Sequence, residues 1–172
     1  MSGRKKLLLF FLSLIAILLL ISIWYNYNYS METAEEFKVN SPELSRKLLI
    51  ATQGSEFKDE VTKGVVTHFK NDSVFIKVID VSSLKLINPK DYTALVVIHT
   101  WENWKAPEDV ELFINRTKEN LNKIIVLTTS GEGSYKMENV DAITGESKLD
   151  NTDTYINEIL KRLNPILTPK SI

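Results

Sequence analysis

Residues 47–58 read KLLIATQGSEFK, in which an apolar run is followed by a short polar turn and the start of an amphipathic segment. The run at residues 48–51 has no polar residue, which is typical of a strand buried on both faces of a parallel sheet. After the turn, apolar residues recur at the three- and four-residue spacing of a helix. They are Phe57, Val61, Val65 and Phe69. The stretch therefore predicts a buried strand that leads directly into a helix.

The same alternation continues to the end of the chain. Further apolar runs predict strands at residues 74–81, 94–98, 124–127 and 140–143, and helical spacing predicts helices over residues 110–121 and 156–163. The connections at 82–92 and 128–139 are close to the minimum of about a dozen residues for a parallel crossover, so we expect a fourth helix to be absent or one turn long. The pattern predicts an α/β fold, a three-layer sandwich with a five-stranded parallel sheet.

On the N-terminal side of this domain lies an uncharged apolar run at residues 7–24. At about 1.5 Å per helical residue, the run nearly matches a hydrocarbon core of about 30 Å, so we expect it to cross a lipid bilayer. Basic residues precede the run, and aromatic and then acidic residues follow it. By the positive-inside rule, the N-terminus is cytoplasmic and the folded domain is extracytoplasmic, which makes a single-pass protein. The flanking residues are Arg4, Lys5 and Lys6, then Trp24, Tyr25, Tyr27 and Tyr29, and finally Glu32, Glu35 and Glu36.

We therefore expect three parts: a signal-anchor or transmembrane helix at residues 1–25, a linker at 26–46 containing Ser41 and Pro42, and one folded domain at 47–172. A cleaved secretory signal is the alternative, because a basic region followed by an apolar region describes both. The apolar run exceeds the usual length of about 7 to 15 residues, and no small-x-small cleavage site follows it. The absence of cysteine excludes a lipoprotein anchor and a disulfide framework.

The charge of the chain argues against a nucleic-acid partner. The first 24 positions hold three basic and no acidic residues, so 18 basic and 22 acidic residues remain, a net charge of −4. Neutralising phosphates needs a basic surface. There are two histidines, and we expect His68 at a helix surface and His99 packed at a strand end. Because no tight His/Asp/Glu grouping is present, we expect no metal.

The loops after the strands are where a ligand would bind, because in open parallel sheets ligands lie outside the carboxyl ends of the strands. Residues 50–58 resemble the phosphate loop of the flavodoxin family, and 91–104 and 129–135 are similar to its third strand and two flavin-flanking loops. The resemblance implies FMN as cofactor. It implies phosphate contacts from Thr52, Gln53, Gly54 and Ser55, and ring contacts from Thr100, Trp101, Asn103, Trp104, Ser130, Gly131 and Tyr135.

The phosphate loop departs from the flavodoxin pattern at two positions. Gln53 and Glu56 stand where the family carries threonine. A carboxylate at Glu56 would repel a phosphate while itself satisfying the positive end of the helix dipole. A ligand-free turn is therefore the alternative interpretation of this loop, with Glu56 as an ordinary residue of the first helical turn.

A second motif lies at residues 141–147, DAITGES, which looks like the Asp-x-x-Ser/Thr-Gly-Ala-Thr motif at which some extracytoplasmic proteins attach FMN covalently. The resemblance would make Ser147 the acceptor. Glu146 and Ser147 depart from the alanine and threonine of that motif. The alternative is a strand end followed by a glycine turn.

Two functions follow from these observations. The first is a membrane-anchored flavodoxin-like protein that binds FMN and transfers electrons, with the flavin supplying the chemistry. The second is a cofactor-free flavodoxin-like scaffold, an interaction module of a membrane complex, because a fold does not fix a function. In either case, the anchor makes a membrane protein the expected partner.

Overall fold

The computed structural model describes residues 3–29, 31–102 and 104–168. The chain divides into two compact units, Met1–Met31 and Glu32–Ile172, which are described separately. In the first unit, α1 (Gly3–Tyr29) is a helix of 27 residues. Its stretch Gly3–Trp24 is long and apolar enough to cross a membrane by length and composition. In an α-helix the backbone N–H and C=O groups form hydrogen bonds with one another, which is what a hydrocarbon environment requires.

The second unit is a six-stranded sheet in the order β1-β3-β2-β4-β5-β6. Five strands are parallel to one another, and each contains or overlaps a strand predicted from an apolar run. The central pairing sets Ile50 opposite Val78 on one side and Val96 on the other. The parallel strands are β2 (Arg46–Thr52), β3 (Val74–Asp80), β4 (Ala94–Thr100), β5 (Ile124–Thr129) and β6 (Ala142–Gly145).

The sheet has six strands, one more than the five that the sequence predicts. β1 (Phe37–Val39) lies within the predicted linker, residues 26–46, and pairs antiparallel with β3. The compact unit thus begins at Glu32 and not at residue 47. A strand of three largely exposed residues has no apolar run to signal it. Its position is decided by the open edge of β3, which offers unpaired backbone groups.

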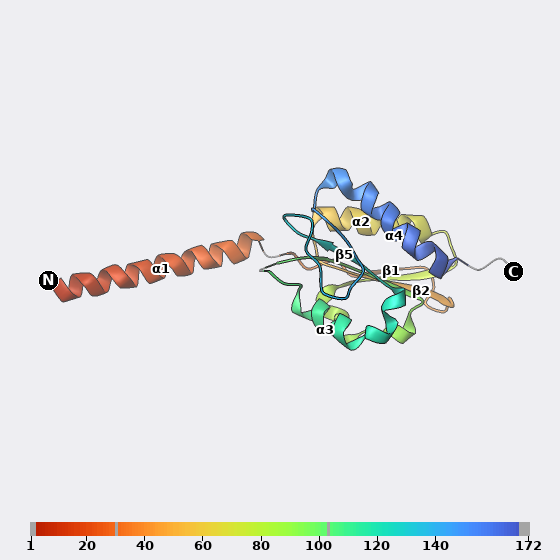
Figure 1. Ribbon diagram of the computed structural model, residues 1–172, viewed down its shortest axis with the longest axis horizontal. Coiled ribbons are helices and arrows are strands. Elements are labelled where there is room, and N and C mark those ends of the chain that lie inside the picture. The colour runs from red at the N-terminus through yellow and green to blue at the C-terminus, as the bar shows by residue number, and fades with distance from the viewer. Residues whose placement is uncertain (1–2, 30, 103, 169–172) are drawn as a thin grey trace. The chain divides into compact units, whose positions relative to one another are not determined.

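Helices cover both faces of the sheet (Figure 1). α2 (Glu56–Phe69) and α4 (Thr152–Leu167) pack on one face, and α3 (Glu108–Arg116) and the 3₁₀ helix η1 (Val81–Leu86) on the other. Side chains of a strand point alternately to the two faces. Leu48 and Ile50 of β2 therefore join the α2/α4 core, whereas Leu49 and Ala51 join the α3 core.

The two short connections behave as the sequence predicts. Between β3 and β4 the chain makes only the 3₁₀ turns η1 and η2 (Pro89–Asp91), and residues 130–141 between β5 and β6, all described, contain no helix. α3 is followed by η3 (Lys118–Lys123), and η4 (Leu149–Asn151) precedes α4. The α3 face is therefore covered by less helix than the α2/α4 face.

Candidate functional site

The carboxyl ends of β2, β4, β5 and β6 meet at one edge of the sheet, and hydrogen bonds join them. The Thr100 N–H donates to Gln53 Oε1 at 2.8 Å, which links β4 to β2. Thr100 Oγ1 lies 3.0 Å from Thr129 Oγ1, and Ser147 Oγ donates to the same Thr129 oxygen at 2.8 Å. The structure thus brings together residues that the sequence separates by more than ninety positions. This edge is the candidate functional site.

The turn between β2 and α2 is hydrogen-bonded within the protein. Ser55 is the N-cap of α2, and its Oγ accepts the backbone N–H of Lys58 at 3.3 Å. The Gly54 N–H donates to the carbonyl of Glu32 at 2.7 Å. A Cβ at Gly54 would lie only 2.8 Å from the Thr33 carbonyl oxygen, so a side chain has no room here. Buried Thr52 donates its hydroxyl to the Gln53 carbonyl at 3.1 Å.

The segment that covers Gly54 is residues 32–36, which we call the strap. The buried Asp80 carboxylate accepts the backbone N–H of Ala34 at 2.9 Å. Ser83 Oγ donates to Glu36 Oε1 at 2.8 Å. These bonds attach the strap to the ends of β3 and η1, while the Glu32 carbonyl attaches it to the β2–α2 turn. The strap is therefore part of the folded unit.

A lysine is buried beside this edge. The Lys58 side chain, in the first turn of α2, has no exposed surface. Burial lowers its pKa to about 8, while the negative charge of Glu102 acts in the opposite direction. Glu102 Oε1 in turn accepts a hydrogen bond from Gln53 Nε2 at 3.0 Å. Glu102 thus lies within a polar network of the protein and holds the β2 and β4 loops together.

The two histidines lie as the sequence predicts: His68 is exposed on α2, and His99 is fully buried near the end of β4. Burial lowers the pKa of His99 to about 4, so the ring is neutral at physiological pH. Its Nε2 lies 3.0 Å from Thr128 Oγ1 on β5. His99 therefore packs inside the sheet. Among the described residues no group of three or more His, Asp or Glu side chains could hold a metal ion.

The aromatic residues of the two flanking loops contact one another. The rings of Trp101 and Tyr135 are nearly parallel, with centroids 6.1 Å apart and an interplanar angle of 7°. A flat ring inserted between them would need about 7 Å, two carbon–carbon contact distances. Trp104 meets Tyr135 edge-on at 6.3 Å, is 83% exposed, and has a left-handed φ of 65°. The fourth residue predicted in this loop, Asn103, lies outside the described residues.

The loop after β5 holds the remaining predicted contacts. Ser130 is buried, and its Oγ has no hydrogen-bond partner among the described residues. Gly131 is exposed with open space around its Cα, and Gly133 adopts a left-handed φ of 67° that closes the turn. Ser147, predicted as a covalent acceptor, lies at this edge with its hydroxyl donated to Thr129.

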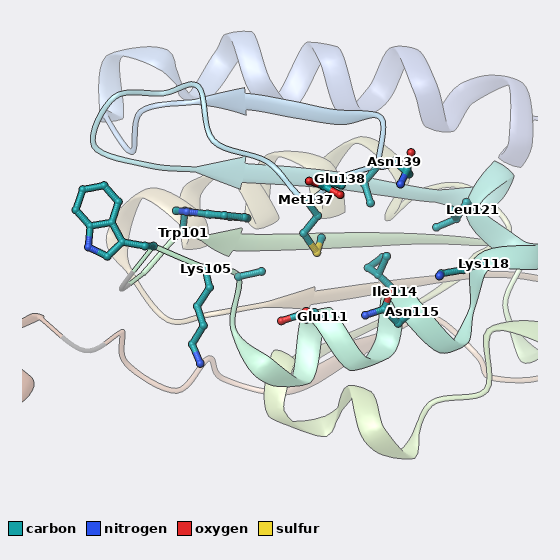
Figure 2. A pocket seen from close by; sticks show the side chains of 13 residues that line it. Trp101, Lys105, Glu111, Ile114, Asn115, Lys118, Leu121, Met137, Glu138 and Asn139 are labelled. Carbon is teal, nitrogen blue, oxygen red and sulfur yellow. The ribbon is translucent and has the colours of Figure 1, made fainter.

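A groove of about 730 Å³ opens beside these loops on the α3 face. Figure 2 shows Met137 reaching from the segment after Tyr135 toward Ile114 on α3, with Trp101 at one end of the groove. Its floor is apolar, and Lys105, Glu111, Lys118 and Glu138 supply charges of both signs around it. The groove occupies the place where a helix between β5 and β6 would otherwise lie.

No protein-family model matches the chain, and no curated protein matches its sequence.

Sequence reasoning missed two features of this region, Lys58 and the strap. Lys58 carried a signal: it stands three residues before Val61 and seven before Val65, on the buried stripe of α2. A lysine at such a position is rarely fully buried unless it is paired. The strap carried no comparable signal, because among its five residues only Ala34 is buried.

Proposed function

We propose that this chain is a membrane-anchored, flavodoxin-like interaction module that holds a membrane-protein partner without a flavin. When only the parallel strands are counted along the chain, from β2 as the first to β6 as the fifth, their order across the sheet is 2-1-3-4-5. This is the doubly wound order of flavodoxin-like proteins. The apolar helix α1 supports an anchor. The basic residues before it support an extracytoplasmic position for the folded unit.

The observation that carries the cofactor-free assignment is the strap on Gly54. A phosphate at a helix N-terminus is bound by free backbone N–H groups. Here the Gly54 N–H is donated to the Glu32 carbonyl, and the Ser55 hydroxyl caps α2. Glu56 adds a carboxylate at the first helical position. The strap thus takes the Gly54 donor away from a phosphate, and Glu56 adds one repelling charge.

The predicted site of the flavin ring also argues against a bound flavin. Trp101 and Tyr135 are too close to admit a flat ring between them. Gln53, one of the predicted phosphate contacts, is held by hydrogen bonds with Thr100 and Glu102. The residues in this arrangement do not fit FMN, either bound noncovalently or attached at Ser147.

The groove on the α3 face supports a protein partner. Tryptophan, methionine and tyrosine are enriched where proteins bind one another, and exposed tryptophan is a frequent anchor of such contacts. Trp104 lies on the groove lining and is 83% exposed. Since the anchor confines the domain to the membrane surface, the partner is an extracytoplasmic segment of another membrane protein.

FMN-dependent electron transfer is the second candidate, and one observation favours it. The structure brings Trp101 and Tyr135 from two loops into parallel rings at the carboxyl edge of the sheet. Flavin binding would require these rings to separate and the strap to leave Gly54.

A flavin titration separates the two candidates. The full chain in non-ionic detergent is incubated with FMN, passed through gel filtration, and its visible absorbance is recorded before and after denaturation. We expect a colourless protein. Yellow colour that leaves on denaturation would overturn the proposal in favour of a noncovalent carrier, and colour that stays with the chain would point to Ser147.

Photo-crosslinking tests the partner directly. A benzoylphenylalanine introduced at Trp104 should form an adduct with a membrane protein in native membranes, and Asn115→Arg, which places a bulky charge on the groove lining, should reduce it several-fold. Leu86, which is 81% exposed and is not among the groove-lining residues, is the matched control position. Equal adducts from both positions would contradict a partner in the groove.

A further inference from the structure

The groove on the α3 face lies where the layer of helices is incomplete. In a doubly wound sandwich a crossover usually carries a helix, and the axes of neighbouring helices lie about 8–10 Å apart. Residues 130–141, all described, connect β5 to β6 without one. The groove, of about 730 Å³, lies between α3 and the last residues of this connection. The surface that a crossover helix would cover is therefore open to another helix.

One wall of the groove is a single face of α3 and η3. Its residues stand three or four positions apart, which sets them above one another on a helix. They are Glu111, Ile114, Asn115, Lys118 and Leu121. The opposite wall is formed by residues 137–140. A face with this spacing presents ridges of side chains that pack into the surface of a second helix.

The length of the groove matches a helix of this fold. Figure 2 shows Trp101 at one end and Leu121 at the other. Trp101 follows β4 at the carboxyl edge of the sheet, whereas Leu121 precedes β5, so the groove runs along the six residues of β5. At about 3.3 Å per strand residue this length is about 20 Å, which a helix of about 13 residues spans.

The floor of the groove favours a helix over an extended peptide. Ala106, Ile114, Met137 and Val140 line it and belong to the α3 core. These side chains offer no hydrogen bonds to the backbone of a bound segment. An extended segment would leave its backbone groups unpaired against them, whereas a helix pairs its backbone groups internally. The occupant must also present an apolar stripe to this floor.

The rim of the groove carries charges that the protein itself does not pair. Among the described residues, no salt bridge involves Glu111, Lys118 or Glu138, and all three side chains are exposed. Lys118 follows Glu111 by seven residues, about two helical turns. A docked helix with a cation at the level of Glu111 and an anion two turns further would pair with both charges.

We propose that the groove binds an amphipathic helix of about 13 residues from the membrane-protein partner, with a lysine or arginine against Glu111 and an aspartate or glutamate against Lys118. The inference rests on the proposed function, and it specifies the conformation and the charge order of the partner segment. The bound helix completes the layer that α3 begins, because it takes the place of the helix that the β5–β6 connection lacks.

A designed peptide tests the conformation of the occupant. The probe is a fluorescein-labelled, lactam-bridged helix of about 14 residues, with leucine along one stripe, lysine in the first turn and glutamate two turns later. We expect it to bind the full chain in detergent, measured by fluorescence anisotropy. The same peptide with a central proline in place of the bridge cannot form the helix and should bind at least tenfold more weakly. Equal binding of the two peptides would overturn the inference.

Exchange of the rim charges tests the charge order. The double variant Glu111→Lys, Lys118→Glu should weaken binding of the peptide about tenfold, because two exposed pairs become repulsive. A peptide with its lysine and glutamate positions exchanged should bind this variant as tightly as the first peptide binds the unaltered chain. Since both residues are exposed, the double variant keeps its core. Failure of the exchanged peptide to restore binding would overturn the charge order.

Two substitutions on α3 place the peptide in the groove. Asn115→Arg, on the lining, should weaken its binding several-fold. Leu112 is 57% exposed on the same helix but is not among the groove-lining residues, so Leu112→Arg is the matched control and should leave binding unchanged. Equal effects of the two variants would contradict binding in the groove. A dimer of the full chain that Asn115→Arg dissociates on gel filtration would make the occupant a second copy and overturn the inference.

The helix inference and the proposed function can fail separately. If the photo-crosslinker at Trp104 captures a membrane protein but the helical peptide does not bind, the partner segment is not a helix and the inference alone is overturned. If the peptide binds with the expected charge dependence but no membrane protein is captured, the groove accepts a helix and the proposed membrane partner is overturned.

Discussion

The two faces of the sheet are covered unequally. On one face, α2 and α4 form a continuous layer, with Gly64 leaving room for Ile156 where the helices meet. On the other face, α3 is the only α-helix that the described residues form, and both remaining crossovers that could cover this face are too short for another. Crossover length, more than composition, therefore decides where this protein leaves an open surface.

The same contrast applies at the carboxyl edge. The β2 loop, on the α2 side, is covered by the strap and hydrogen-bonded to it at Gly54. The loops after β4 and β5 border the groove, and Trp104 is largely exposed there. One half of the edge is thus closed by the protein's own backbone, and the other half is available to a partner.

Truncating an apolar residue on each face should give the largest difference. Ile159→Ala, at a fully buried position of α4, should lower the free energy of unfolding by about 2–5 kcal/mol because the closed layer cannot fill the cavity. Leu121→Ala, at a half-buried position on the groove lining, should cost only about 1–2 kcal/mol. Urea denaturation of the full chain in detergent measures both. Equal losses would mean that the groove face is packed as tightly as the helical face.

The pH dependence of stability should come partly from the α3 face, to which His99 points in register with Leu95 and Val97. Since burial lowers its pKa from 6.5 to about 4, the unfolded chain binds a proton in this range that the native protein does not. The free energy of unfolding should therefore fall as the pH drops from about 6.5 to about 4, by up to about 3 kcal/mol.

His99→Asn should flatten this fall, and urea midpoints between these pH values measure the slope. The exposed His68 on α2 is the matched control, and His68→Asn should leave the slope unchanged. An unaltered slope in His99→Asn would show that His99 is accessible and titrates normally in the native state.

A pair of glycine substitutions compares the closed and open halves of the edge. Gly54→Ala would push a methyl group against two strap carbonyl oxygens, at 2.8 and 2.9 Å, and should cost about 1–3 kcal/mol. Amide hydrogen exchange at Ala34 should accelerate as the strap loosens. Gly131→Ala meets nothing within 4 Å, so it should be neutral or stabilising by up to about 1 kcal/mol. Similar losses for both variants would contradict a closed β2 loop.

The sequence could predict where the carboxyl edge of the sheet lies, but not which of its residues contact one another. The apolar runs before Thr52, Thr100 and Ser130 place all three loops at the ends of parallel strands, and the structure brings the strands together there. Whether a loop is free depends on contacts across the fold. The Gly54 N–H bonds to a residue 22 positions earlier, and Trp101 stacks on a residue 34 positions later. No local pattern encodes such pairs.

The apolar helix, the five parallel strands and their helices can all be predicted from the sequence, because each depends on periodicity within a window of a few turns. The number of residues between strands likewise shows that two crossovers are too short for a full helix. Tertiary contacts, in contrast, place the edge strand β1 and the strap over Gly54 and bury Lys58. These depend on which surfaces meet after the chain has folded, and hydrogen bonding and burial at such contacts are properties of the assembled layers.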